Sequence, residues 1–142
     1  MTSTDLNSYV TFGYLTVAVF YLIIYIATST QSAVRKAPFG ILIIVFALHT
    51  AGIVWRWIES YQMGIGHAPL SNLYESLVFF AWCIALALIL ARLRYAADFI
   101  VLLGLPLVFI TLASTFLLDA SIKPLIPALQ SNWLVAHVIT CF

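Results

Sequence analysis

The chain has 142 residues, of which 64% are hydrophobic and only 8% are charged. Soluble globular domains carry about a quarter charged residues, so this composition excludes an ordinary water-soluble domain. Six Lys and Arg against five Asp and Glu give a net charge of +1. The chain therefore lacks the basic surface that a nucleic-acid partner requires, and a lipid bilayer is its expected surroundings.

Long apolar runs predict membrane-spanning helices. A helix needs about 20 mostly apolar residues to cross a hydrocarbon core about 30 Å thick. A fifth run begins near Trp133 and is cut short at Phe142. The sequence thus predicts an all-α polytopic transmembrane bundle of about five spans, with residues 1–142 as a single domain and the N-terminal part of a longer protein. The four complete runs are Val10 to Thr28, Phe39 to Trp57, Leu73 to Ala91 and Phe99 to Leu118.

The positions of Lys and Arg predict the orientation. Arg35 and Lys36 lie in the first connection, and Arg92 and Arg94 lie in the third. Because cytoplasmic connections are enriched in these residues, we expect the N-terminus outside. The two longest connections, Ile58 to Asn72 and Asp119 to Asn132, then lie on the outer face.

Glu75 stands at the start of the third predicted span, three residues after Asn72. This is the spacing of a capping box, with Asn72 as the N-cap and Glu75 at the third helical position. We therefore expect Glu75 to act mainly as a helix cap. The alternative is a buried carboxylate that contacts a substrate or a neighbouring helix.

Arg56 lies between two tryptophans at the outer end of the second predicted span. A long cation at this depth usually extends to the lipid headgroups. His49, Gly52 or Ile53, and Arg56 nevertheless share one helix face, at spacings of three, four and seven residues. A porphyrin with anionic propionates would also fit such a face.

The three histidines all lie at or within the membrane. His49 is near the midplane, where it is either a functional group or a neutral side chain bonded to a neighbouring helix. His67 lies in an outer connection beside Gly66 and a proline, and there an ordinary loop histidine is expected. His137 follows Trp133 by one helical turn. Because haem iron is held by one or two imidazoles against an apolar, aromatic wall, His49, His67 and His137 are all candidate haem ligands.

One long segment resembles a known family. Gly66 to Leu77 reads GHAPLSNLYESL and is followed by Phe79-Phe80-Ala81-Trp82. This segment resembles the cytochrome c biogenesis protein CcsA (ResC) family, the haem-handling membrane subunit of the System II cytochrome c synthase. Arg56-Trp57 and the segment from Ser131 to Val138 strengthen the resemblance.

The resemblance implies that His137 is one axial ligand of the iron of a haem b held at the outer face. It also implies a CcsB (ResB)-like membrane partner and an apocytochrome c whose Cys-x-x-Cys-His thiols receive the haem. The family's tryptophan-rich motif and second outer histidine would come after Phe142. The intact complex would act as a cytochrome c synthase, whereas we expect this segment alone to be inactive.

Two alternatives from other classes stay open. A cytochrome-b-like electron carrier also places histidines on membrane helices but transfers no haem covalently. A structural membrane subunit binds no haem. The location expected from the sequence is a bacterial plasma membrane, and a thylakoid membrane is the alternative.

Overall fold

The computed structural model describes residues 2–27, 36–66, 68–96 and 98–122, and the single residues 124, 133 and 140. Within these residues the chain forms four long helices and a short 3-10 helix, and no strand. The long helices, the last counted through Leu117, are long and apolar enough to cross a membrane. The chain is therefore an integral membrane protein, as predicted. The elements are α1 (Ser3–Ala27), α2 (Lys36–Gln62), α3 (Leu73–Tyr95), α4 (Asp98–Ser114) and η2 (Thr115–Leu117).

The helices do not begin and end where the predicted apolar runs do, and α4 ends at Ser114 rather than Leu118. Helix α1 begins at Ser3 rather than Val10, and α2 continues to Gln62, so residues 58–62 of the predicted outer connection are helical. Hydropathy marks only the part of a helix inside the hydrocarbon, whereas caps and tertiary contacts decide where it ends. The predicted fifth span lies mostly outside the described residues, of which it includes only Trp133 and Thr140.

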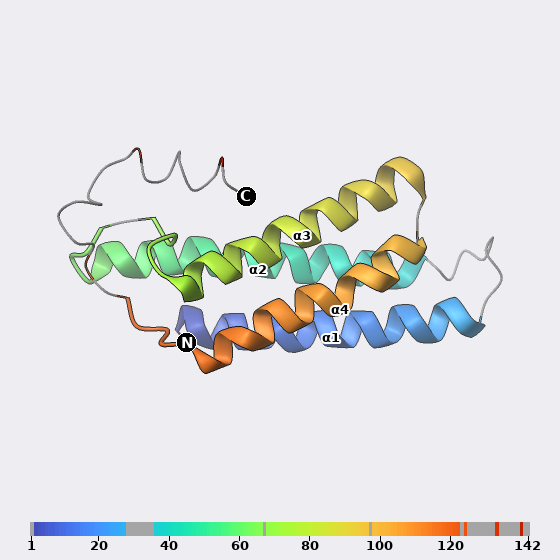
Figure 1. Ribbon diagram of the computed structural model, residues 1–142, viewed down its shortest axis with the longest axis horizontal. Helices are drawn as coiled ribbons and strands as arrows, with labels where there is room; N and C mark the ends of the chain where they lie inside the picture. The colour runs from blue at the N-terminus through green and yellow to red at the C-terminus, as the bar shows by residue number, and fades with distance from the viewer. Residues whose placement is uncertain are drawn as a thin grey trace.

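The helices lie along the long axis of one bundle (Figure 1). Helix α1 packs against α2 and α4, and α3 packs against α4 and α2. Short connections between successive membrane helices favour antiparallel neighbours, and this arrangement follows that rule.

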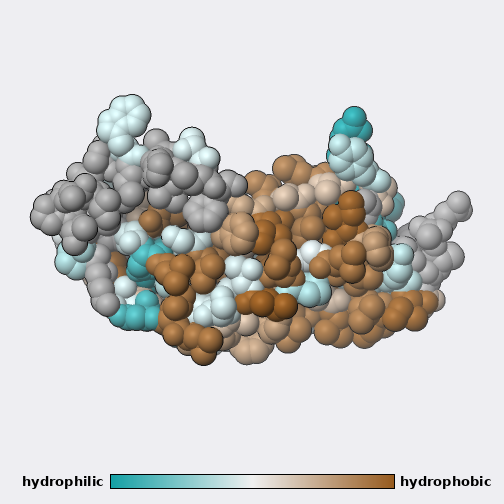
Figure 2. Space-filling view, viewed as in Figure 1, coloured by the Kyte–Doolittle hydropathy of each residue, from teal (hydrophilic) through white to brown (hydrophobic). Residues whose placement is uncertain are grey.

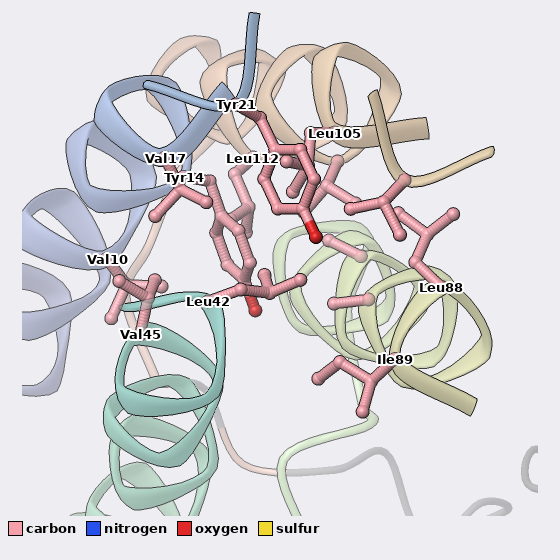
Figure 3. Close-up of a cluster of buried hydrophobic side chains, with 14 of the residues drawn as sticks. Val10, Tyr14, Val17, Tyr21, Leu42, Val45, Leu88, Ile89, Leu105 and Leu112 are labelled. Atoms are coloured by element: carbon pink, nitrogen blue, oxygen red, sulfur yellow. The ribbon is translucent and has the colours of Figure 1, made fainter. Parts of the chain in front are cut away.

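One face of each helix supplies the core. On α1 the buried residues recur every three or four positions, which is the stripe expected of a helix with one inward face. Labelled side chains from the four helices converge on the same interior (Figure 3). The other faces carry exposed apolar side chains, which form the brown surface of Figure 2 and suit contact with lipid. The core stripe of α1 is Val10, Tyr14, Val17 and Tyr21, and that of α4 is Val101, Leu105, Val108 and Leu112.

Charged groups pair where α3 turns into α4. Helix α3 ends at Tyr95, and its C-cap residue Ala96 has a left-handed backbone with φ of 52°. Arg92 forms an ion pair with Asp98, and the Tyr21 hydroxyl donates to Asp98 Oδ1 at 3.4 Å. We call this the Arg92 end of the bundle, and the opposite end, where α1 and α3 begin, the Ser3 end.

Candidate functional site

A buried ion pair lies at the Ser3 end. Arg56 Nε of α2 donates to Glu75 Oε1 of α3 at 2.9 Å, and the two side chains are only 6% and 1% exposed. The prediction that Arg56 extends to the headgroups is wrong. Its charge is neutralised inside the bundle because the first turn of α3 brings a carboxylate within reach, and a paired buried charge needs no solvent.

Glu75 combines the two roles that its position allowed. Asn72 Oδ1 accepts from the Glu75 backbone N–H at 2.9 Å, which confirms Asn72 as the N-cap of α3. Glu75 Oε2 accepts from the backbone N–H and the hydroxyl of Ser71, at 2.8 and 2.7 Å. Glu75 Oε1 contacts the neighbouring helix through Arg56. Its carboxylate therefore binds Ser71, just before the start of α3, and also joins α3 to α2 through Arg56.

Arg56 also binds the chain beyond η2. Its Nη2 donates to the backbone carbonyl of Ala120 at 2.9 Å, and its guanidinium lies 4.8 Å from the centroid of the Tyr74 ring. The planar fork of arginine allows such simultaneous contacts. One side chain thus joins α2, the start of α3 and the segment that follows η2. No sequence pattern predicts the Ala120 contact, because any backbone carbonyl can accept a hydrogen bond.

Two residues of α1 make further contacts at this end. Asn7 Nδ2 donates to the Tyr74 hydroxyl at 3.2 Å and to Thr115 Oγ1 at 3.4 Å. The backbone N–H of Ser3 donates to both carboxylate oxygens of Glu59, at 3.1 and 3.3 Å. Polar contacts at the Ser3 end therefore join α1, α2, α3 and η2.

His49 is the middle residue of α2 and is 1% exposed. The Tyr14 hydroxyl of α1 lies 3.2 Å from His49 Nδ1, and the two rings meet edge to face with centroids 5.7 Å apart. The structure therefore shows the bond to a neighbouring helix that the sequence offered as one of two alternatives.

The predicted face of α2 lines a small cavity. His49, Gly52, Ile53 and Arg56 all border this cavity between α1, α2 and α3. Its volume is about 20 Å³, enough for about one water molecule. A haem against this face stays a prediction, and it would require the helices to move apart.

Of the other three predicted site residues, the structure describes only Trp133. Trp133 is described and its side chain is 82% exposed. His67 and His137 lie outside the described residues. Among the described residues no cluster of three or more His, Cys, Asp and Glu side chains could hold a metal ion. The haem-ligand role of His137 stays a prediction.

Helix number, apolar outer faces and a polar network at one end define a polytopic α-helical membrane protein. No protein-family model matches the chain. Proteins named cytochrome c biogenesis protein CcsA do: the chain is 44% identical to that of Chlorella vulgaris over 93 residues, 63% of this chain and 28% of the relative. It is 41% identical to that of Prochlorococcus marinus (strain AS9601) over 113 residues, 77% of this chain and 34% of the relative.

A third relative, CcsA of Prochlorococcus marinus (strain MIT 9312), is 36% identical over 133 residues, which are 87% of this chain and 41% of the relative. The chain belongs to the CcsA cytochrome c biogenesis family. It spans about a third of the length of these relatives.

Proposed function

We propose that the intact protein presents haem b at the outer membrane face for covalent attachment to apocytochrome c. The observation that carries this proposal is the similarity to CcsA proteins over as much as 87% of the chain. The haem is a substrate here. Each thiol of a Cys-x-x-Cys-His segment adds across one haem vinyl group, with sulfur bonding to one carbon and the proton going to the other. Each addition forms a thioether and needs no further reactant.

His137 is the proposed axial ligand of the haem iron, with Trp133 as an aromatic neighbour. The protein's part in the reaction is positioning and electrostatics, since the haem vinyl groups and the thiols carry the chemistry. Trp133 is largely exposed, and an aromatic ring packs well against a planar ligand. A CcsB (ResB)-like membrane subunit is the proposed partner, in a bacterial plasma membrane or a thylakoid membrane.

Arg56 is a proposed positioning residue for this outer site. It holds the backbone at Ala120, from which the chain continues toward Trp133 and His137. Glu75 fixes the guanidinium of Arg56, and Tyr74 lies against its face. The contact between Arg56 and Ala120 therefore restricts the position of the backbone from which the chain continues toward Trp133.

The experiment compares the purified full-length protein with its His137→Ala variant. We expect lower haem content and a changed reduced absorption spectrum, with partial recovery when imidazole occupies the vacant iron position. His67→Ala tests the other candidate histidine of the predicted outer face, and it should leave the spectrum unchanged if His137 is the ligand. An unchanged spectrum in His137→Ala would overturn the ligand assignment.

A further inference from the structure

The small cavity at the Ser3 end is lined by polar groups as well as apolar side chains. It lies between α1, α2 and α3 and has a volume of about 20 Å³. On α2 its lining runs from Arg56 to His49, seven residues or about 10 Å deeper into the bundle. We call this cavity, which is large enough for about one water molecule, the slot. Its polar lining residues are Ser3, Asn7, His49, Arg56, Tyr74 and Glu75.

Three buried polar atoms on this lining have no hydrogen-bond partner among the described residues. They are Ser3 Oγ, Asn7 Oδ1 and His49 Nε2, on side chains of residues that are 4%, 7% and 1% exposed. The His49 ring also interacts with the Val78 backbone, but Nε2 makes no hydrogen bond that meets normal geometry. Buried polar groups in native proteins are nearly always paired with protein or with ordered water.

We propose that this slot is a hydration site that holds an ordered water molecule on His49 Nε2. Empty cavities are apolar, whereas a cavity that is polar and at least 10–15 Å³ in volume, as a rough threshold, holds water. The donors and acceptors match, because water both donates and accepts, Asn7 Oδ1 accepts, and the hydroxyl of Ser3 does either. His49 Nε2 donates a hydrogen bond to the water molecule in one tautomer of the ring and accepts one in the other.

The consequence is that a buried water molecule lies beside the middle of a membrane helix. The Tyr14 hydroxyl occupies His49 Nδ1, so Nε2 is the atom through which the ring exchanges its proton with this water molecule. Ser3, at the start of α1, lines the same slot. This inference is independent of the proposed haem function.

A cysteine-accessibility experiment on the full-length protein tests the slot. Gly52 lines it, and a Cβ atom added there lies 3.6 Å from the Leu6 side chain, an ordinary contact distance, so Gly52→Cys is the labelled variant. In a background without the native cysteines, the silver ion Ag⁺ is the probe because it is small enough for a hydrated slot. The matched control is Leu42→Cys, on the same helix but fully buried in the apolar core.

We expect the thiol at position 52 to react with Ag⁺ at least about tenfold faster than the thiol at position 42, because polar cavities hold water and apolar ones stay dry. Equal rates would overturn the proposal. A second measurement avoids substitution in the slot: ring-¹⁵N-histidine NMR of the unaltered protein, with the His49 signal identified by its loss in His49→Phe. Magnetisation transfer from water to His49 Nε2 is expected, and a ring without water contact would contradict the hydration site.

Discussion

Arg56 and Glu75 form a buried ion pair that joins α2 to α3, with 2.9 Å between Nε and Oε1. Burying two charges is costly, and their attraction offsets that cost only when further hydrogen bonds satisfy the remaining atoms. Ser71 satisfies the second carboxylate oxygen, and Ala120 accepts from the guanidinium. The pair therefore holds α2, the start of α3 and the segment after η2 together at the Ser3 end.

Glu75→Gln should destabilise the full-length protein. Glutamine keeps an acceptor for the Ser71 groups, so the start of α3 is preserved, but the buried charge of Arg56 loses its counterion. Breaking a buried pair by removing one partner costs about 3–5 kcal/mol. Thermal unfolding of the purified protein measures the loss. A Glu75→Gln protein as stable as the unaltered one would mean that the carboxylate acts only as a cap.

The double variant Arg56→Gln/Glu75→Gln should be less damaged than the sum of the single variants. Contacting residues show coupling energies of about 0.5–3 kcal/mol in such cycles. The same unfolding measurement on all four proteins gives the coupling. Additive losses would show that the two side chains stabilise the protein independently.

Arg56→Lys should preserve the ion pair and lose the Ala120 contact, because an ammonium group lacks the planar fork that serves both acceptors. Loss of one charged hydrogen bond costs about 1.5–3 kcal/mol. Proteolysis kinetics at the segment after η2 provide the measurement, and we expect faster cleavage than in the unaltered protein. Unchanged cleavage in Arg56→Lys would contradict the anchoring role.

Gly104→Ala should loosen the contact between α3 and α4. A side chain at Gly104 would overlap the Leu88 side chain, and overpacking of this kind costs about 1–3 kcal/mol. Gly40→Ala is the matched control, because a side chain there meets nothing within 4 Å. In a membrane-protein unfolding assay the first variant should be less stable than the second. The opposite order would contradict the close packing.

The predicted orientation places residues 64–68 outside. Gly64 has a φ of 72°, where a cysteine would be strained, so the exposed Met63 is the better labelling position. In intact cells a thiol at Met63→Cys should react with an impermeant reagent, whereas one at the exposed Tyr95→Cys should react only after permeabilisation. The reverse pattern would show that the N-terminus is inside.

The spans could be predicted because membrane helices need only a sufficient length of apolar sequence. The Asn72 cap was also predictable, since its partner is three residues away and cap geometry is local. The helix ends were not, because polar residues outside the hydrocarbon continue α2 to Gln62 without a hydropathy signal.

The contacts of Arg56 and His49 could not be predicted in the same way. Arg56 finds its partners on α3 and beyond η2, and His49 finds Tyr14 on α1. These partners are set by how the helices pack, and sequence spacing within one helix reveals only which residues share a face. The shared face of His49 and Arg56 was predicted correctly, but the width of the space against it depends on the facing helices.

The most direct test of the proposed function is covalent haem transfer by the full-length protein. It is co-expressed with its CcsB-like partner and an apocytochrome that carries one Cys-x-x-Cys-His segment, and haem attached to the denatured cytochrome is measured by its peroxidase stain. We predict a haem-stained cytochrome band that disappears without the full-length protein and weakens with His137→Ala. Reversible haem redox activity without any stained cytochrome, or a stained band of equal strength without the protein, would contradict the account.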